Sequence, residues 1–348
     1  MDVRRRAIGC ALLAALFYAL NAPLSKLMMS DVPPRMMAVL LYLGAGVGVG
    51  AMYALHWRRE EPGQRLTRRD LPYTVGMILL DICAPIFLML GLRYGSASGA
   101  SLLGNFEIVA TALIALVVFG EKVSRRLWLA IVVIMLSGML LSLEGQEGPG
   151  FSRGSLLVLL ATACWGLENN CTRSISDKST YQIVTLKGIF SGGGALCVAL
   201  MSGERLPHMA AVLPAMALGF VAYGLSIFMY IRAQRDLGAA KTSAYYAVAP
   251  FVGALLSFVL MGEPLTGTYL AAAALMLAGT ALAVSDTLTS RHAHRHSHTV
   301  MHLHDGKLHA HTIVHEHEHA HCAATAHHGH RHARAELRRE LAALHHGA

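Results

Sequence analysis

Long apolar segments follow one another along residues 7 to 285, separated by short stretches of charged and turn-forming residues. Segments of about 18 to 24 apolar residues are long enough to cross a hydrocarbon core of about 30 Å as helices. The predicted spans are residues 7–29, 34–56, 71–92, 95–118, 125–143, 154–173, 181–203, 209–231, 238–261 and 265–285. The pattern therefore predicts an all-α polytopic membrane protein with ten transmembrane helices.

Basic residues in the loops predict how these helices are oriented. One set of alternate loops contains Arg4, Arg5, Arg6, Arg58, Arg59, Arg65, Arg68, Arg69, Lys122, Arg125, Arg126, Arg173, Lys178, Arg232 and Arg235. The other set contains only Arg35, Arg93, Arg153 and Arg205. Because cytoplasmic loops carry the excess of Lys and Arg, we expect a multi-pass protein of the cell (inner) membrane with both termini in the cytoplasm.

Composition agrees with a membrane protein and excludes several other classes. Of the 348 residues, 54% are hydrophobic and 14% charged, which is too apolar for a soluble domain of this length. The formal charge of +8 does not indicate nucleic-acid binding, because the basic residues lie in the loops. No Ser–His–Asp or HExxH pattern is present, and the glycines of "SGGG" at 191–194 lie within a span and lack the Lys-Ser/Thr ending of a phosphate loop. We therefore expect neither an enzyme nor a nucleotide-binding protein, and no required cofactor.

The two halves of the apolar region resemble each other. The segment 95–138 aligns with 238–279 at an offset of about 142 residues, anchored by Gly120-Glu121 and Gly262-Glu263. More faintly, "FYALNAPLSK" at 17–26 aligns with "CWGLENNCTR" at 164–173. Each unit holds five spans, and two tandem units with an odd number of spans must have opposite topologies, as in many secondary transporters.

On these residues the chain resembles the drug/metabolite transporter superfamily in its EamA form. The resemblance covers nearly all of residues 7 to 285, and it implies two inverted five-helix repeats and carrier-type transport, most often efflux of small metabolites. We divide the chain into a first repeat (1–143), a linker (144–153), a second repeat (154–285) and a tail (286–348). One departure concerns the first half: Asn105 and Ile108 stand where the family often has proline, whereas Pro250 is retained in the second half. A helix break in the first half would therefore lack its usual proline.

Ionisable residues inside predicted spans are functional candidates, because burying a charge at mid-membrane costs about 2.5–3.5 kcal/mol on insertion scales. Asp81, Glu107 and Glu168 lie well inside the third, fourth and sixth spans. In one interpretation they line a central cavity and bind a cation, exchange protons or neutralise an amine. In the other they pair with Lys26, Arg173 or Lys241 and hold the bundle together. The stripe Cys164–Glu168–Cys171 is a weaker candidate for a soft-metal site.

Other polar and aromatic residues inside the spans are further candidates for the transport path. The full set is Asn21, Lys26, Asp81, Glu107, Trp165, Glu168, Asn169, Asn170, Arg173, Tyr245, Tyr246 and Pro250. Lys26 and Arg173 hold an anionic group or a gate in one interpretation, and are helix-end charges that reach the interface in the other. Tyr245, Tyr246 and Trp165 stack on a planar substrate or serve packing. The glutamates of the two Gly-Glu pairs are expected to cap or brace loops.

The tail has a different composition. It contains 18 of the 20 histidines and no core-forming apolar pattern, so we expect it to be largely disordered. Imidazoles bind Zn, Ni, Co or Cu, and the metal-ligand candidates are His296, His298, His302, His304, His309, His311, His315, His317, His319 and His321. A more ordered alternative is a hairpin turning at Asp305-Gly306, in which His302 faces His309 and His296 faces His315.

Two functions remain open from the sequence. The first is a small-metabolite exporter of the EamA kind, for an amino acid or similar solute, whose tail binds metal. The alternative is a divalent metal exporter for Ni, Co or Zn, with the tail as collector or sensor. The expected partners are the lipid bilayer and a small solute or metal ion, without nucleic acid; a homodimer is compatible with either function.

Overall fold

The computed structural model describes residues 3–56, 65–119, 123–143, 152–175, 178–237, 242, 245–287, 289–304 and 307–322. Within these ranges, the side chains of residues 4, 56, 115, 118–119, 142–143, 173, 234–235 and 287–322 lie outside the description. The chain forms two compact units, residues 1–286 and 287–348, which we describe separately.

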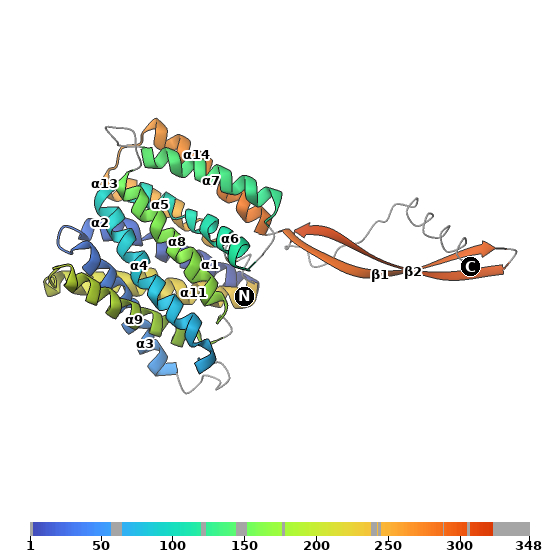
Figure 1. The fold of residues 1–348 in the computed structure, drawn as a ribbon, viewed down its shortest axis with the longest axis horizontal. Coiled ribbons are helices and arrows are strands. Elements are labelled where there is room, and N and C mark those ends of the chain that lie inside the picture. Colours follow the sequence, from blue (N-terminus) through green and yellow to red (C-terminus); the bar gives the residue numbers. More distant parts are fainter. Residues whose placement is uncertain are drawn as a thin grey trace. The chain divides into compact units, whose positions relative to one another are not determined.

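The first unit is helical throughout its described residues (Figure 1). Its first half consists of α1 (Val3–Ala19), α2 (Asn21–Met28), α3 (Pro34–His56), the short 3-10 helix η3 (Arg68–Asp70), α4 (Leu71–Tyr94), α5 (Ala97–Leu103), α6 (Phe106–Phe119) and α7 (Arg125–Leu143). Its second half consists of α8 (Arg153–Arg173), α9 (Thr180–Met201), α10 (Met209–Gly219), the π-helix η4 (Phe220–Leu225), α11 (Ser226–Leu237), α13 (Ala249–Met261) and α14 (Gly267–Thr287).

Seven of the described helical segments are long and apolar enough to cross a membrane. They are Arg5–Met28, Pro34–Leu55, Arg68–Tyr94, Ala97–Ile114, Thr180–Met201, Met209–Ala233 and Gly267–Asp286. The remaining predicted spans correspond to α7, α8 and the shorter apolar helix α13. The prediction of a helical, multi-pass membrane protein is confirmed for this unit.

Helices from the two halves pack against each other throughout the unit. Such pairs include α3 with α9, α4 with α8, α1 with α11, and α5 with α13. Small residues permit the closest of these approaches: a Cβ atom on Gly188 of α9 would lie only 2.3 Å from the backbone nitrogen of Gly46 on α3. Helix backbones come this close only where side chains are absent, as is common in membrane helix packing.

Three predicted spans are interrupted near the middle of the unit. The first breaks at Leu20, between α1 and α2, where Pro23 lacks the N–H that would continue the hydrogen-bond ladder. The fourth breaks at Gly104-Asn105, between α5 and α6, although neither residue is a proline. In the eighth, the π-helical turn η4 widens the helix between α10 and α11. The break in the fourth span therefore forms without a proline, at Gly104 followed by the buried Asn105.

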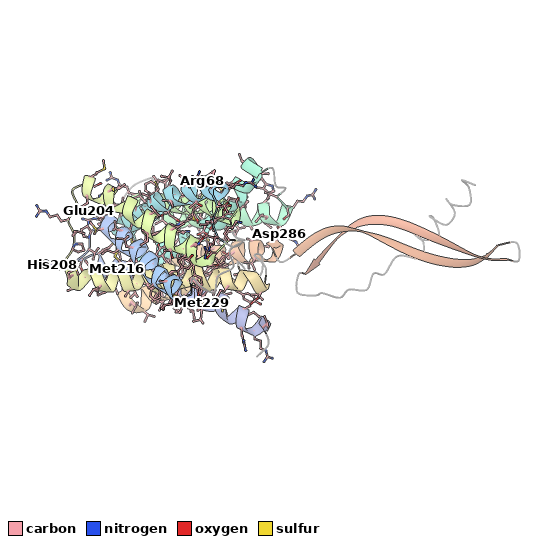
Figure 2. The ribbon with its side chains drawn as sticks, turned by 90° about the horizontal axis from the view of Figure 1, so that it is seen from below. Arg68, Glu204, His208, Met216, Met229 and Asp286 are labelled. Carbon is pink, nitrogen blue, oxygen red and sulfur yellow. The ribbon has the colours of Figure 1, made fainter. Side chains whose placement is uncertain are left out.

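The helices α7 and α14 lie side by side (Figure 1), joined where the Ser137 hydroxyl donates to the Ala272 carbonyl at 2.7 Å. The Ser124 hydroxyl, just before α7, donates to the carboxylate of Asp286 at 2.5 Å. Glu204 and His208 lie at the end of the unit opposite to Asp286 (Figure 2).

The second unit contains a two-stranded antiparallel hairpin formed by β1 (Thr289–His304) and β2 (Lys307–Cys322). In its register His302 is opposite His309 and His296 is opposite His315, as the hairpin alternative predicted. The expectation that the tail is largely disordered is therefore not confirmed for these two segments, which form strands. The turn residues Asp305 and Gly306 lie outside the described residues.

Candidate functional site

Three charged side chains from three helices meet inside the helical unit. The Lys187 Nζ of α9 lies 3.0 Å from Asp81 Oδ2 of α4 and 3.0 Å from Glu168 Oε1 of α8. All three residues are buried, Asp81 completely. We call Asp81, Glu168 and Lys187 the charged triad. When all three are ionised, the charged triad carries a formal charge of −1.

Two hydroxyl groups complete this arrangement. The Tyr42 hydroxyl of α3 donates to Asp81 Oδ1 at 2.8 Å, and Thr172 donates to Glu168 Oε1 from one turn further along α8. Asp81 Oδ2 forms the ion pair with Lys187 but has no well-aligned hydrogen bond from the side chains that the structure describes. This oxygen is the least satisfied acceptor of the triad.

Lys187 was not among the candidates drawn from the sequence, although the argument used for the three acids applies to it as well. It lies seven residues into the predicted span 181–203, in "TYQIVTLKGIF", where a lysine is as costly as a carboxylate. The prediction that Lys26 pairs with one of the buried acids was wrong, because its ammonium group donates to backbone carbonyls. The side chain of Arg173, and Lys241 as a whole, lie outside the description.

Glu107 lies beside the triad but has its own partner. The Asn169 side-chain amide of α8 donates to Glu107 Oε1 of α6 at 2.6 Å. The neighbouring Asn170 donates to the Gly166 carbonyl of its own helix at 2.8 Å. Glu107 and Asn169 are half-buried, whereas Asn170 is buried. Asn170 therefore braces α8, while Glu107 and Asn169 form a polar pair next to the triad.

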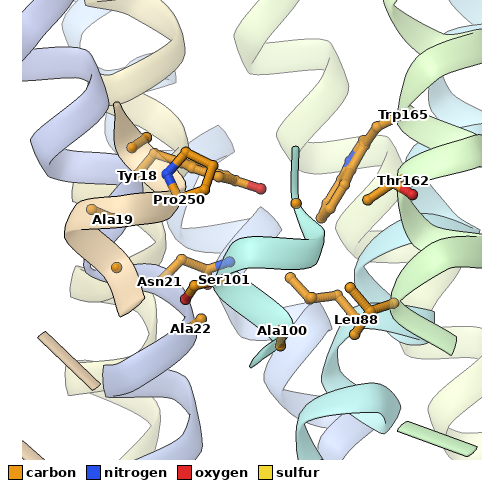
Figure 3. Close-up of a pocket in the computed structure, with 14 residues that line it drawn as sticks. Tyr18, Ala19, Asn21, Ala22, Leu88, Ala100, Ser101, Thr162, Trp165 and Pro250 are labelled. Atoms are coloured by element: carbon orange, nitrogen blue, oxygen red, sulfur yellow. The ribbon is translucent and has the colours of Figure 1, made fainter. Parts of the chain in front are cut away.

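A small cavity lies where the interrupted helices meet (Figure 3), with about 30 Å³ of space for water-sized groups. It is lined from both sides of the α1–α2 break, from α5 up to Gly104, and from the start of α13, which begins with Ala249 and Pro250. Tyr18, Asn21 and Pro250 lie on one side of the cavity, and Leu88, Thr162 and Trp165 on the other (Figure 3). The structure thus brings the predicted residues Asn21, Trp165 and Pro250 together.

Two polar groups near this cavity are buried without partners among the described residues. They are the hydroxyl of Ser101, which lines the cavity, and the side-chain nitrogen of Asn105, at the break that follows it. A buried polar group without a hydrogen bond costs about 1–3 kcal/mol, so such groups are rare unless a ligand or water completes them. The cavity is therefore able to accept a hydrogen-bonding ligand.

A chain of polar and aromatic contacts links this cavity to the charged triad. The Asn21 side chain donates to the Tyr223 hydroxyl of η4 at 2.9 Å, and the Tyr223 ring lies 5.1 Å from the ring of Tyr42. Tyr42 in turn donates to Asp81. Neither tyrosine was a candidate from the sequence, because nothing in a single sequence distinguishes them from packing residues.

The remaining predicted aromatics form a second group. The Tyr246 ring lies 5.8 Å from that of Tyr18 and 5.0 Å from that of Tyr230, and its hydroxyl is 3.4 Å from the Ser226 hydroxyl. Tyr245 is half-buried. Tyr246 therefore takes part in packing around Tyr18, which lines the cavity.

Lys26 lies apart from the triad and binds backbone. Its Nζ donates to the carbonyls of Leu92 and Gly95, the latter at 2.9 Å, at the C-terminal end of α4. The positive charge compensates the unpaired carbonyls at a helix C-terminus. Lys26 therefore holds α2 against the α4–α5 junction.

The stripe Cys164–Glu168–Cys171 does not form a metal centre. Glu168 is held by Lys187 and Thr172, and Cys171 faces Gly76 of α4. Among the residues whose side chains are described, no three His, Cys, Asp or Glu are arranged to hold a metal ion. The tail histidines fall outside that statement, because only their backbone register is described.

Comparison with known proteins places this architecture in a family. The model of the EamA-like transporter family matches residues 5–143 and again residues 152–285. An uncharacterized transporter of Methanothermobacter thermautotrophicus is 26% identical over 270 residues, covering 72% of this chain and 78% of the relative. A probable amino-acid metabolite efflux pump of Salmonella typhimurium is 26% identical over 284 residues, covering 77% and 91%.

Two further matches agree with this assignment. An uncharacterized inner membrane transporter of Escherichia coli K12 is 24% identical over 250 residues, covering 67% of this chain and 76% of the relative. A solved crystal structure of a protein has a similar fold, with a TM-score of 0.59 at 21% identity over 80% of this chain and 96% of that chain. This multi-pass membrane protein is therefore a transporter rather than an enzyme, and it belongs to the EamA-like transporter family.

Proposed function

We propose that this protein exports a small metabolite, an amino acid or a solute of similar size, across the cytoplasmic membrane. The observation that carries the proposal is the cavity beside the α1–α2 and α5–α6 interruptions, whose wall contains the buried Ser101 hydroxyl, which has no partner among the described residues. Broken helices are where transporters of repeated architecture bind their substrates, because freed backbone and side-chain groups face the ligand.

The lining fits a solute with both polar and apolar parts. Asn21, Ser101 and Thr162 offer hydrogen-bonding groups, and Trp165 and Tyr18 offer aromatic surfaces. An amino acid presents both kinds of group. The Salmonella relative, named as a probable amino-acid metabolite efflux pump, supports the same class of solute.

The proposed arrangement in the membrane is ten helices in two inverted repeats, 1–143 and 154–285, with both termini in the cytoplasm. The two separate matches to the family model support the repeats. The helix contacts support the repeats too. In the proposed repeats α1 corresponds to α8, α3 to α9 and α4 to α11. The contact of α4 with α8 therefore has its counterpart in the contact of α11 with α1, and the contact of α3 with α9 is its own counterpart. The distribution of basic loop residues supports the orientation.

The alternative of a metal exporter is not favoured. The acids that would have to bind the metal are already engaged, Asp81 and Glu168 by Lys187 and Glu107 by Asn169. A metal ion would have to displace a fixed ammonium group from between two carboxylates.

Metal binding by the hairpin is a separate proposal, which its register supports. Four pairs of histidines are directly opposite: His292 with His319, His294 with His317, His296 with His315, and His302 with His309. Because alternate residues of a strand share a face, His292 and His294 join the ten histidines expected from the sequence. Opposed positions are about 4.5–5.5 Å apart at Cβ, close enough for two imidazoles to share a Zn²⁺, Ni²⁺, Co²⁺ or Cu²⁺ ion.

Export is tested by expressing the full-length chain in bacterial cells and measuring amino acids released into the medium by mass spectrometry. Cells with the wild-type protein are expected to release one or a few amino acids faster than cells with Trp165→Ala. The matched control is Trp128→Ala, which removes an exposed tryptophan from the outside of α7. Equal release by both variants and by cells without the protein would reject the proposal.

A further inference from the structure

The charged triad is not electrically balanced. Lys187 neutralises one of the two carboxylates of Asp81 and Glu168, so one negative charge remains in a site that is almost fully buried. Burying an uncompensated charge within a membrane protein is costly, and the common resolution is to take up a compensating ion or a proton.

Other titratable groups surround the triad without supplying that positive charge. Those that face the two carboxylates from neighbouring helices are Tyr42, Tyr223, Cys164, Cys171 and Glu107. Each of them is neutral or acidic. Among the residues whose side chains are described, Lys187 is the basic group that contacts Asp81 and Glu168.

On this basis we propose that Asp81 is the proton-coupling group of the transporter, an inference that rests on the proposed transport function. In each cycle the Asp81 carboxylate takes one proton from one side of the membrane and becomes a neutral carboxylic acid. It releases that proton to the other side, while the solute moves in the opposite direction. Lys187 remains paired with Glu168 throughout.

The geometry distinguishes Asp81 from Glu168 as the proton acceptor. Glu168 Oε1 receives both the ion pair and the Thr172 hydroxyl, whereas Asp81 Oδ2 has the ion pair alone. A proton fits here better than a sodium ion, because the Lys187 ammonium already occupies the space between the carboxylates. A sodium ion would also need several oxygen ligands, whereas a proton needs one.

The contact chain from the cavity explains how solute and proton influence each other. Protonation of Asp81 weakens it as an acceptor for Tyr42, whose ring packs against Tyr223, the partner of Asn21 in the cavity wall. Because Asp81 is completely buried in this conformation, a proton reaches it only when the helices move.

The first test needs no solute. Infrared difference spectra of the purified full-length protein, recorded over a pH series, are expected to show a carboxylic-acid band of Asp81 that appears on acidification. The band disappears in Asp81→Asn and persists in Asp31→Asn, which removes an exposed aspartate. Asp81→Asn also brings the triad to zero formal charge, so it leaves no uncompensated charge among the three side chains. A band retained in Asp81→Asn overturns the inference.

The second test uses proteoliposomes and a mixture of the proteinogenic amino acids as the probe. An imposed gradient of one pH unit can sustain roughly tenfold accumulation in one-for-one exchange with a proton. Wild type is expected to approach this value. Asp81→Asn is expected to lose the response to the gradient, whereas the control Asp31→Asn is expected to respond as the wild type does.

The two tests separate the inference from the proposed function. Absence of exchange by the wild type rejects transport of these solutes, while the infrared band still decides whether Asp81 binds the proton. Exchange that responds to a sodium gradient and ignores the pH gradient overturns proton coupling but leaves the transport function intact.

Discussion

Glu263 caps a helix that begins 166 residues earlier in the chain, at Ala97. Its carboxylate accepts hydrogen bonds from the backbone N–H groups of Ala97 at 2.8 Å and Ser98 at 3.1 Å, at the start of α5. Lys26 binds the carbonyls of Leu92 and Gly95 immediately before it. The α4–α5 junction is therefore held from both sides, by an anion at a helix N-terminus and a cation at a helix C-terminus.

Replacing Glu263 by alanine is expected to destabilise the protein by about 1–2 kcal/mol, because the first N–H groups of α5 lose their acceptor. Thermal unfolding of the purified protein in detergent would measure this loss. Glu263→Gln keeps one acceptor oxygen and should recover part of the stability. An unfolding temperature unchanged in Glu263→Ala would show that water replaces the cap.

Lys187→Met should be among the most destabilising single substitutions in the chain, by about 3–5 kcal/mol, because it leaves two buried carboxylates without their cation. The double variant Lys187→Met, Asp81→Asn should regain part of this loss. Lys26→Met is the matched control, since its ammonium binds carbonyls and not carboxylates. Comparable unfolding temperatures for Lys187→Met and Lys26→Met would contradict a structural ion pair.

Gly188→Ala is expected to disrupt the packing of α3 against α9. The added Cβ atom would meet Gly46 backbone atoms at 2.3–2.4 Å, which neither helix can relieve by rotating a side chain. A Cβ at Gly193, on the same helix, would meet nothing within 4 Å, so Gly193→Ala is the control. We expect poor yield of folded Gly188→Ala by size-exclusion chromatography and normal yield of Gly193→Ala.

Ser101→Ala should reduce transport without reducing stability. It removes a buried hydroxyl that has no partner among the described residues, so the free energy of unfolding should stay the same or rise by about 1 kcal/mol. Ser137→Ala is the opposite case: it breaks the bond to Ala272 outside the cavity and should lower stability while preserving transport. Thermal unfolding and amino-acid release are measured for both variants. A loss of stability in Ser101→Ala would indicate that this hydroxyl has a structural role.

Zinc binding to the hairpin should depend on register and not on the number of histidines. Replacing His315, His317 and His319 by alanine removes one member from three opposed pairs, and should weaken Zn²⁺ binding by roughly tenfold or more. Replacing His327, His328 and His330, which follow Cys322 in the sequence, removes the same number of imidazoles. Isothermal titration of full-length protein compares the two variants, and equal losses would favour an unstructured histidine-rich ligand.

Much of this architecture is predictable from hydrophobic pattern. The apolar segment lengths, the repeat anchored by Gly120-Glu121 and Gly262-Glu263, and the capping role of Glu263 all follow from sequence, because membrane thickness and helix termini impose local requirements. The hairpin register followed from the position of Asp305-Gly306 between alternating histidines. Lys187 was predictable by the same rule that selected Asp81, and was missed.

The partners of these residues required the tertiary structure. A sequence shows that Asp81 and Glu168 are costly to bury, but not that one lysine on a third helix lies between them. It shows Asn105 in place of proline, but not that the helix still breaks at Gly104, where the nearby Ser101 hydroxyl has no partner among the described residues. The length and polarity of each segment are set by the surrounding medium, so consecutive residues of the sequence are enough to predict them. The partners of the buried side chains and the shape of the cavity depend on contacts between helices that are far apart in the sequence. Only the folded chain determines these contacts.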